Sequence, residues 1–145
     1  MERDCVFCRE TGGELLWQNE LCRVVLADEP DYPGLCRVIL RQHVAEMTDL
    51  PPADRQRLMA VVFAVEAAQR TVLSPDKINI ASLGNVVPHL HWHIIPRWHD
   101  DATFPAPVWA SPARPGARHH VSADTLARLR LALQHIELEA VQRLP

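Results

Sequence analysis

Two short apolar segments near the start of the chain are separated by a polar turn. Residues 21–27 and 35–41 are rich in aliphatic and β-branched side chains, and a Pro-Gly pair at 33–34 suits a tight bend between them. This pattern predicts a hairpin of two strands. Cys22 and Cys36 fall on the apolar faces of these strands, so we interpret both as small core residues.

Two later segments of the chain have apolar residues at helical spacing. Apolar residues recur every three or four positions between a Pro-Pro pair and a Ser-Pro pair, which predicts one long helix from Pro52 to Leu73. These apolar positions are Leu58, Val61, Val62, Val65, Ala68 and Val72. A C-terminal helix is predicted over about 122–143, with Ser122 as its N-cap. Its apolar stripe consists of Leu126, Leu129, Leu133 and Ile136.

Two further strands and a loop complete the predicted elements. Residues 77–83 and 89–95 are predicted strands, and prolines at 88 and 96 bracket the second one. Residues 101–116 contain four prolines and a glycine, so we expect an ordered surface loop there. Strands combined with one long helix and a terminal helix predict an α+β fold with an antiparallel sheet. The length suits a single domain over residues 1–145.

Composition narrows the class of protein. The 145 residues are 48% hydrophobic and carry a net charge of −3, which excludes a disordered chain and disfavours a nucleic-acid binder with a large basic patch. No apolar run is long enough for a membrane helix, and the acidic N-terminus does not resemble a signal peptide. We therefore expect a cytoplasmic protein with neither a membrane nor a nucleic acid as its partner.

Three histidines at 89, 91 and 93 alternate with apolar residues. On a strand this spacing places the three imidazoles on one face and the apolar side chains on the other, against the core. The histidine face then lines a cleft or faces solvent. Two chemistries fit such a cleft: a histidine-ligated metal site, or nucleophilic catalysis by a neutral imidazole with a second imidazole assisting the leaving group. A histidine-ligated metalloenzyme therefore stays an alternative at this point.

The histidine pattern, followed by Pro96 and Arg97, resembles the signature of the histidine triad (HIT) family of nucleotide hydrolases and transferases. Residues 79–85 are similar to the family's asparagine strand and glycine-containing phosphate loop, and residues 30–34 to its proline-glycine turn. The resemblance covers about residues 5–97. It implies a HIT-like α+β fold with a sheet of about five antiparallel strands.

The implied activity is hydrolysis or transfer at the α-phosphate of dinucleoside polyphosphates or nucleoside phosphoramidates, through a nucleotidyl-histidine intermediate. The alternative is a nucleotide-binding regulatory protein with slow turnover. No P-loop is present, so the sequence does not require a metal for this chemistry, and we expect no organic cofactor.

The resemblance also implies roles for individual residues. His91 would be the nucleophile, and His93 would contact the phosphate oxygens and the leaving atom. Asn85 matches a phosphate-contacting amide and Asn79 a substrate-side amide, although Asn79 could equally satisfy backbone groups at a strand end. Asp28 lies beside the family's ribose-binding position.

The chain departs from the family pattern at three positions. The ribose-binding position itself is Ala27, which weakens the assignment of Asp28. Leu35 stands where the family commonly has histidine. Val86 stands where one branch has serine or threonine, so no hydroxyl at this position assists the leaving group.

A C-x-x-C pair at the N-terminus is one half of a zinc site. Zinc-carrying bacterial members of the family are similar in this respect, and by that resemblance Cys5, Cys8, His43 and His89 would hold a structural zinc ion. The other two triad histidines would stay free for chemistry. The alternative is a pair of ordinary thiols with His43 on the surface, in which case His89 would orient its neighbours by hydrogen bonds.

Several other side chains allow two interpretations. Arg97 could face the substrate phosphates or form a surface ion pair with Asp100 or Asp101. Aromatic residues in or beside the 101–116 loop could wall the cleft or cover the core. These are Trp98, Phe104 and Trp109. The remaining histidines have no patterned partners, so we expect His99, His119, His120 and His135 to be exposed to solvent.

The long helix carries more apolar residues than a single face needs. Phe63 in particular would be exposed on a monomer, and burial in a two-fold interface would remove that apolar patch. Proteins that resemble this one commonly form such dimers, so we predict a homodimer. The alternative is that the 101–116 loop or the last helix covers this face within one chain.

Overall fold

The computed structural model describes residues 2–138, apart from the side chain at position 118. Within this part of the chain, five strands form one antiparallel sheet in the order β1-β2-β3-β5-β4. The strands are β1 (Glu14–Gln18), β2 (Cys22–Leu26), β3 (Cys36–Leu40), β4 (Lys77–Ala81) and β5 (His91–Arg97). The helices are α1 (Val6–Arg9), α2 (Pro52–Leu73) and α3 (Ala123–Gln134), with 3-10 turns η1 (Glu2–Asp4), η2 (Met47–Asp49) and η3 (Arg118–His120). The predicted α+β fold is confirmed.

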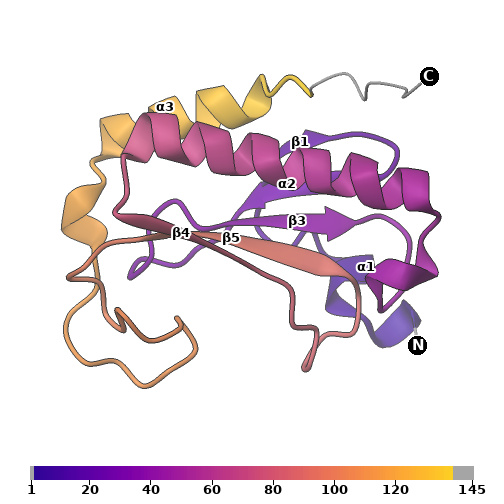
Figure 1. Cartoon of the computed structure of the whole chain (residues 1–145), viewed down its shortest axis with the longest axis horizontal. Coiled ribbons are helices and arrows are strands. Elements are labelled where there is room, and N and C mark those ends of the chain that lie inside the picture. Colours follow the sequence, from indigo (N-terminus) through magenta and orange to yellow (C-terminus); the bar gives the residue numbers. More distant parts are fainter. Residues whose placement is uncertain (1, 139–145) are drawn as a thin grey trace.

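The two long helices cover one face of the sheet. Figure 1 shows α2 and α3 side by side, with α2 packed on β3 and β5 and α3 packed on β1. The main core lies between these helices and the sheet, and its fully buried members include Val24, Val38, Leu58, Val62 and Ile94. The opposite side holds α1, the β4–β5 connection and the 101–116 loop (Figure 1). Because the two long helices and the main core do not cover this second face, polar side chains can lie there.

The predicted hairpin is confirmed. β2 and β3 pair antiparallel with Cys22 opposite Leu40 and Leu26 opposite Cys36. Both cysteines are core residues, with 2% and 0% of their surface exposed. Burial raises the pKa of each thiol to about 12, so both stay protonated and unreactive near neutral pH.

Strand β1 was not among the elements predicted from the sequence. It lies at the edge of the sheet and pairs only with β2, and its register shifts between Leu15 and Trp17. Such a bulge interrupts the alternation of apolar and polar residues on which strand prediction rests. Leu15 is left exposed and Leu16 buried as a result.

The predicted boundaries of β5 were wrong by two residues at each end. The strand begins at His91, and Pro96 lies inside it, opposite Ile78 of β4. Pairing with β3 ends at Ile94, so Pro96 has only one neighbouring strand. A proline without an N–H is tolerated at such an edge position. His89 therefore precedes the strand instead of belonging to it.

The long helix has its predicted bounds. α2 starts with Pro52 in its first turn and ends at Leu73, after which Ser74 adopts a left-handed conformation with φ of 45°. Ser122 caps α3 as predicted, and its Oγ accepts a hydrogen bond from the N–H of Thr125. The helix ends at Gln134, earlier than predicted, and residues 139–143 of the prediction lie outside the described part.

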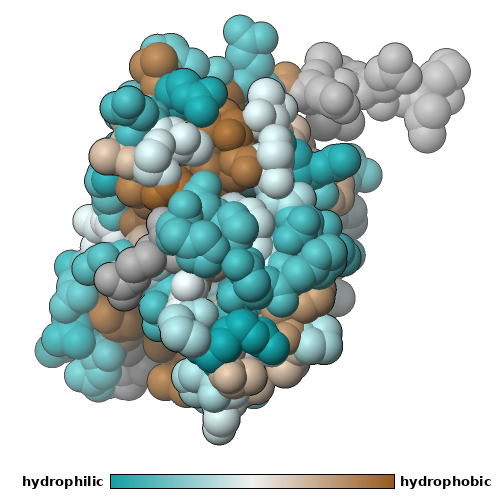
Figure 2. Space-filling view, turned by 90° about the vertical axis from the view of Figure 1, so that its left-hand side faces the viewer, coloured by the Kyte–Doolittle hydropathy of each residue, from teal (hydrophilic) through white to brown (hydrophobic). Residues whose placement is uncertain are grey.

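The 101–116 segment is a loop, as predicted, and it closes on itself. The N–H of Ala113 donates to the carbonyl oxygen of Ala102 at 2.6 Å, which forms a neck. The end of the molecule that carries the 101–116 loop has a mainly hydrophilic surface. Apolar side chains on this view gather higher up, at the level of the two helices (Figure 2). No helix within residues 2–138 is long and apolar enough to span a membrane.

Candidate active site and metal centre

A cavity of about 400 Å³ opens on the sheet face opposite α2. Its lining consists of Phe7, Arg37, residues 83–87, His91, His93 and Trp109. A smaller cavity of about 100 Å³ adjoins it, and the two share Arg37, His93 and Trp109. Residues from α1, β3, β5 and two connecting segments thus converge on one place.

His91 lies at the base of the larger cavity with a fixed ring orientation. Its Nδ1 donates a hydrogen bond to the carbonyl oxygen of His89 at 2.6 Å, which leaves Nε2 as the nitrogen with a free lone pair. The ring of Phe7 packs edge-on against it at 4.7 Å. Burial lowers the pKa of His91, so the ring is neutral near pH 7. A neutral imidazole of fixed tautomer can act as a nucleophile.

His93 stands beside His91 on the same face of β5. The two rings are 5.0 Å apart and meet edge-on, and Trp109 packs against the far side of His93 at 5.5 Å. Burial, followed by repulsion from the protonated form of His91 and from Arg37, lowers the pKa of His93 to about 4. The ring is therefore an uncharged hydrogen-bonding group under ordinary conditions.

The segment between β4 and β5 forms one wall of the cavity. Gly84 adopts a positive φ of 72°, which favours glycine, and Asn85 next to it is exposed at the cavity. The hydroxyl of Ser82 donates to the carbonyl oxygen of His91 at 2.6 Å and so fixes the start of this segment to β5. Val86 is 93% exposed, and no hydroxyl stands at its position.

Two other predicted nucleotide contacts lie elsewhere. The side-chain oxygen of Asn79 accepts a hydrogen bond from Arg97 at 2.8 Å, and Asn79 does not belong to the lining of either cavity. Asp28 is exposed and also lies outside both linings, whereas its neighbour Glu29 lines the smaller cavity. The roles of Asn79 and Asp28 stay predictions.

Sequence reasoning missed Phe7 and Arg37 as members of the site. Phe7 lies in the short helix α1, two residues after Cys5, and only the folded chain places its ring against His91. Arg37 had a visible signal, because it is a charged residue inside the otherwise apolar strand β3. Its position directly opposite His93 in the sheet brings it into the cavity.

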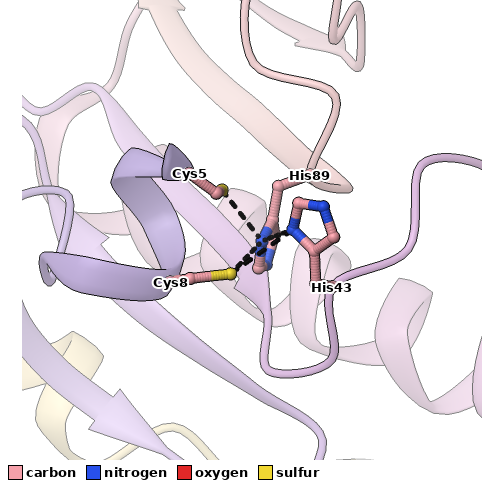
Figure 3. Close-up of side chains that lie close together, drawn as sticks. All are labelled: Cys5, Cys8, His43 and His89. Atoms are coloured by element: carbon pink, nitrogen blue, oxygen red, sulfur yellow. Dashed lines mark hydrogen bonds between the residues drawn. The ribbon is translucent and has the colours of Figure 1, made fainter. Parts of the chain in front are cut away.

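The structure brings together the four predicted metal ligands. Figure 3 shows Cys5, which precedes α1, and Cys8, within α1, directed at the rings of His89 and His43. Sγ of Cys5 is 3.4 Å and Sγ of Cys8 is 3.5 Å from Nδ1 of His89, and Sγ of Cys8 is 3.3 Å from Nδ1 of His43. The two Nδ1 atoms are 3.2 Å apart. All four donor atoms lie within 4.8 Å of one another.

The chemistry of this cluster suits zinc. Two sulfur and two imidazole donors form a common set for a closed, tetrahedral zinc site. Nε2 of His89 donates to the carbonyl oxygen of Leu40 at 2.6 Å, so its Nδ1 lone pair faces the two sulfurs. Zinc-binding histidines typically bond to a backbone carbonyl through their other nitrogen in this way. His91 and His93 are not part of the cluster.

Arg97 forms the ion pair with Asp101 that the sequence allowed as one alternative, but the pair is buried instead of lying at the surface, and Arg97 does not line either cavity. Its guanidinium donates two hydrogen bonds to Asp101, at 2.8 and 3.1 Å, and another to the carbonyl oxygen of Ala106. Burial alone would raise the pKa of Asp101, but Arg97 and three backbone N–H groups lower it. This network fixes the start of the loop that carries Trp109.

The three aromatic residues near the loop have different places. Trp98 is buried in the main core, and the ring of His120 stacks on it at 5.1 Å. Phe104 packs against the guanidinium of Arg97, and only Trp109 lines the cavity.

The exposed histidines do have partners. His119 and His120 share Asp100, with Nε2–oxygen distances of 3.0 and 2.6 Å, and His99 lies beside Asp76. These contacts could not be predicted from a local pattern, because Asp100 lies 19 residues from His119 and 20 from His120.

Comparison with known proteins begins with a match to a family model. The model described as the HIT domain matches residues 9–100 of the chain. An adenylylsulfatase from Arabidopsis thaliana is 28% identical over 133 residues, which covers 86% of this chain and 64% of that protein. An AP-4-A phosphorylase from Mycobacterium tuberculosis is 30% identical over 98 residues, which covers 63% of this chain and 50% of that protein. The chain thus spans between half and two thirds of the length of these relatives.

Solved structures show the same fold. A histidine triad protein from Bradyrhizobium japonicum superposes with a TM-score of 0.68 at 30% identity, over 83% of this chain and 89% of that one. A Zn-bound histidine triad family protein from Mycobacterium smegmatis superposes with a TM-score of 0.65 at 26% identity, over 92% of this chain and 95% of that one.

Proposed function

The chain belongs to the histidine triad family, and from this premise we propose that it is a nucleotide hydrolase or nucleotidyl transferase that acts through His91. Its substrates are small nucleotide conjugates in which a leaving group is joined to the α-phosphate. The relatives named for activity on adenylyl sulfate and on AP-4-A support this class of substrate. The observation that carries the proposal is the hydrogen bond from Nδ1 of His91 to the carbonyl oxygen of His89, at the base of the cavity.

The reaction proceeds in two displacements at phosphorus. Nε2 of His91 attacks the α-phosphorus, a P–N bond forms, and the bond to the leaving group breaks with its electron pair on the leaving atom. Water or another acceptor then attacks the same phosphorus, and the P–N electron pair returns to Nε2. With water the products are a nucleoside monophosphate and a proton released to solvent. The carbonyl oxygen of His89 stabilises the imidazolium that carries the nucleotidyl group.

Three side chains around His91 have supporting roles in this proposal. His93 contacts a phosphate oxygen or the leaving atom, because it is the nearest ring to His91 and lines both cavities. Asn85 donates its amide N–H groups to phosphate oxygens from the opposite wall. Trp109 bounds the cavity on the far side of His93.

We assign the Cys5, Cys8, His43 and His89 cluster as a structural zinc site. When bound, the ion would link α1 and the segment after β3 to the residue that precedes the catalytic strand. These residues would thereby hold the N-terminal segment, including Phe7, against the cavity. No step of the proposed reaction uses the metal.

Intact-mass spectrometry after rapid quenching tests the proposed function. Wild-type protein mixed with a nucleotide conjugate should gain the mass of one nucleotidyl group, and the His91→Asn variant should not. His99→Asn, an exposed histidine outside the cavity, is the matched control and should behave like the wild type. Tight nucleotide binding with neither adduct nor turnover would instead support a regulatory binding protein. Metal-dependent turnover without any nucleotidyl adduct on the wild-type protein would support a metalloenzyme.

A further inference from the structure

Arg37 is a cation in the cavity to which the family resemblance assigns no role. It lies directly opposite His93 in the β3–β5 pairing, it is partly buried, and it lines both cavities. Any ligand that reaches from one cavity to the other must pass its guanidinium and the ring of His93. This placement makes Arg37 a candidate contact for the substrate.

The guanidinium is anchored but not neutralised. Its Nη1 donates one hydrogen bond to the carbonyl oxygen of Gly12 at 2.9 Å, which is its only hydrogen bond within residues 2–138. Arg97, by contrast, is paired with Asp101, and Arg23 donates three hydrogen bonds to the backbone of residues 7–11. Arg37 therefore keeps several N–H donors and its full charge available to a ligand. A partly desolvated cation without an acidic partner binds an incoming anion strongly.

The surrounding groups decide where an anion would bind. Glu29 lines the smaller cavity, so a negatively charged ligand is favoured in the larger one. The ring of His93 is neutral, because burial and the charge of Arg37 lower its pKa to about 4. Within the described residues, Arg37 is thus the permanent positive charge of the larger cavity.

The two substrate classes of this family make opposite demands at the leaving atom. When an anhydride bond breaks, the departing oxygen takes the electron pair as a negative charge, and a cation stabilises it without transferring a proton. When a phosphoramidate bond breaks, the departing amine must acquire a proton. This cavity is short of proton donors there, because His93 is neutral and Val86 has no hydroxyl.

We propose, building on the function proposed above, that Arg37 binds an anionic leaving group and so selects nucleotide anhydrides, with a polyphosphate or sulfate group, over nucleoside phosphoramidates. The guanidinium binds two oxygens of the leaving group with its planar donor edge. Transfer of the nucleotidyl group to His91 then places the new negative charge next to a fixed positive one.

Steady-state kinetics with three substrates from the two classes test this proposal. Adenosine 5′-phosphosulfate and diadenosine tetraphosphate have anionic leaving groups, and adenosine 5′-phosphoramidate has an amine. Wild-type protein should prefer the anhydrides. Arg37→Leu should lower kcat/KM for the anhydrides by about 10- to 100-fold, the effect of losing one charge-assisted contact, and change kcat/KM for the phosphoramidate by less than about threefold. Arg37→Lys, which keeps the charge but not the planar fork, should lie between.

Arg23→Leu is the matched control, because Arg23 is also a half-buried arginine bonded to the same N-terminal segment but lies outside both cavities. It should alter both substrate classes equally. A parallel loss for both classes in Arg37→Leu, or no loss for either, would overturn the proposal. Wild-type preference for the phosphoramidate would do the same.

A binding measurement separates failure of this proposal from failure of the proposed function. Calorimetric titration with inorganic pyrophosphate needs no turnover, and Arg37→Leu should weaken its binding at least tenfold while Arg23→Leu does not. If the wild type forms no nucleotidyl-histidine but pyrophosphate binding still depends on Arg37, the anion site stands and the enzyme assignment falls. If the adduct forms and pyrophosphate binding does not depend on Arg37, the anion site falls alone.

Discussion

The backbone of His89 accepts a hydrogen bond from the ring of His91 at 2.6 Å, while the ring of His89 faces the two N-terminal cysteines. One residue therefore serves two sites: its carbonyl oxygen orients the proposed nucleophile, and its imidazole belongs to the metal cluster. This is possible because His89 precedes β5 and is free of the strand geometry that fixes His91. Any movement of the cluster would shift the hydrogen-bond acceptor of His91.

Replacement of the proposed nucleophile should abolish turnover without unfolding the protein. His91→Asn keeps a polar side chain of similar size but cannot form the covalent intermediate, so turnover should fall by several orders of magnitude. Nucleotide binding measured by calorimetry should change little. A variant that keeps more than about a tenth of the wild-type rate would contradict the assignment.

Zinc should be present and should stabilise the fold. We expect about one zinc ion per chain by elemental analysis, and chelation should lower the melting temperature. Cys5→Ser should lose the metal, whereas Cys22→Ala, which alters a core cysteine outside the cluster, should keep it despite a lower stability. Protein expressed with ample zinc and purified without any would refute the site.

The stability of the fold should fall as the pH is lowered toward 4. The pKa of His93 is depressed from 6.5 to about 4, so between these values the unfolded chain binds a proton that the folded chain does not. Unfolding is then favoured as the pH falls through this window, and the loss is complete below about 4. The free energy of unfolding, measured by urea denaturation at several pH values, should have a smaller slope against pH for His93→Phe than for the wild type. Equal slopes would show that His93 titrates normally in the folded protein.

Light scattering at micromolar concentration should show a dimer. Phe63 is 55% exposed on α2, so neither α3 nor the 101–116 loop covers it within the described chain. A second copy would bury this side chain, and Phe63→Glu should return the protein to a monomer with the histidine strand folded. Leu15→Glu alters an exposed apolar residue on β1 instead and should leave the dimer intact. A wild-type mass near 16.4 kDa would contradict the prediction.

The elements that could be predicted from the sequence are those whose boundary residues and apolar spacing lie within one short segment. The long helix has both proline boundaries and a regular apolar spacing, and the β2–β3 hairpin has strong strands on both sides of its turn. β1 escaped prediction because its bulge breaks the alternation, and the start of β5 was misplaced because His89 fits the same period without pairing.

In the candidate site, too, short motifs could be predicted from the sequence, whereas contacts between distant segments could not. The histidine spacing and the C-x-x-C pair are short motifs that can be identified in one segment, and the structure brings the four predicted metal ligands together. The cavity depends on contacts between distant segments. Arg37 lines the cavity because the register of β3 and β5 places it opposite His93. Arg97 lies outside the cavity and is neutralised by the buried Asp101. The strand register cannot be read from the order of residues alone, whereas the Arg97–Asp101 pair was one of the predicted alternatives and only its burial was not foreseen.

The closed neck of the 101–116 loop makes this segment an exchangeable module. The Ala102–Ala113 hydrogen bond joins its two ends, and Arg97 anchors it to β5 through Asp101 before the neck and through Ala106 within it. Residues 107–112 lie beyond these anchors and can therefore vary in length and composition while the strand that carries the proposed nucleophile stays in place. Grafting this segment between related proteins would accordingly change the wall beside His93, where Trp109 lies, and leave the reacting atoms of the proposed mechanism in place.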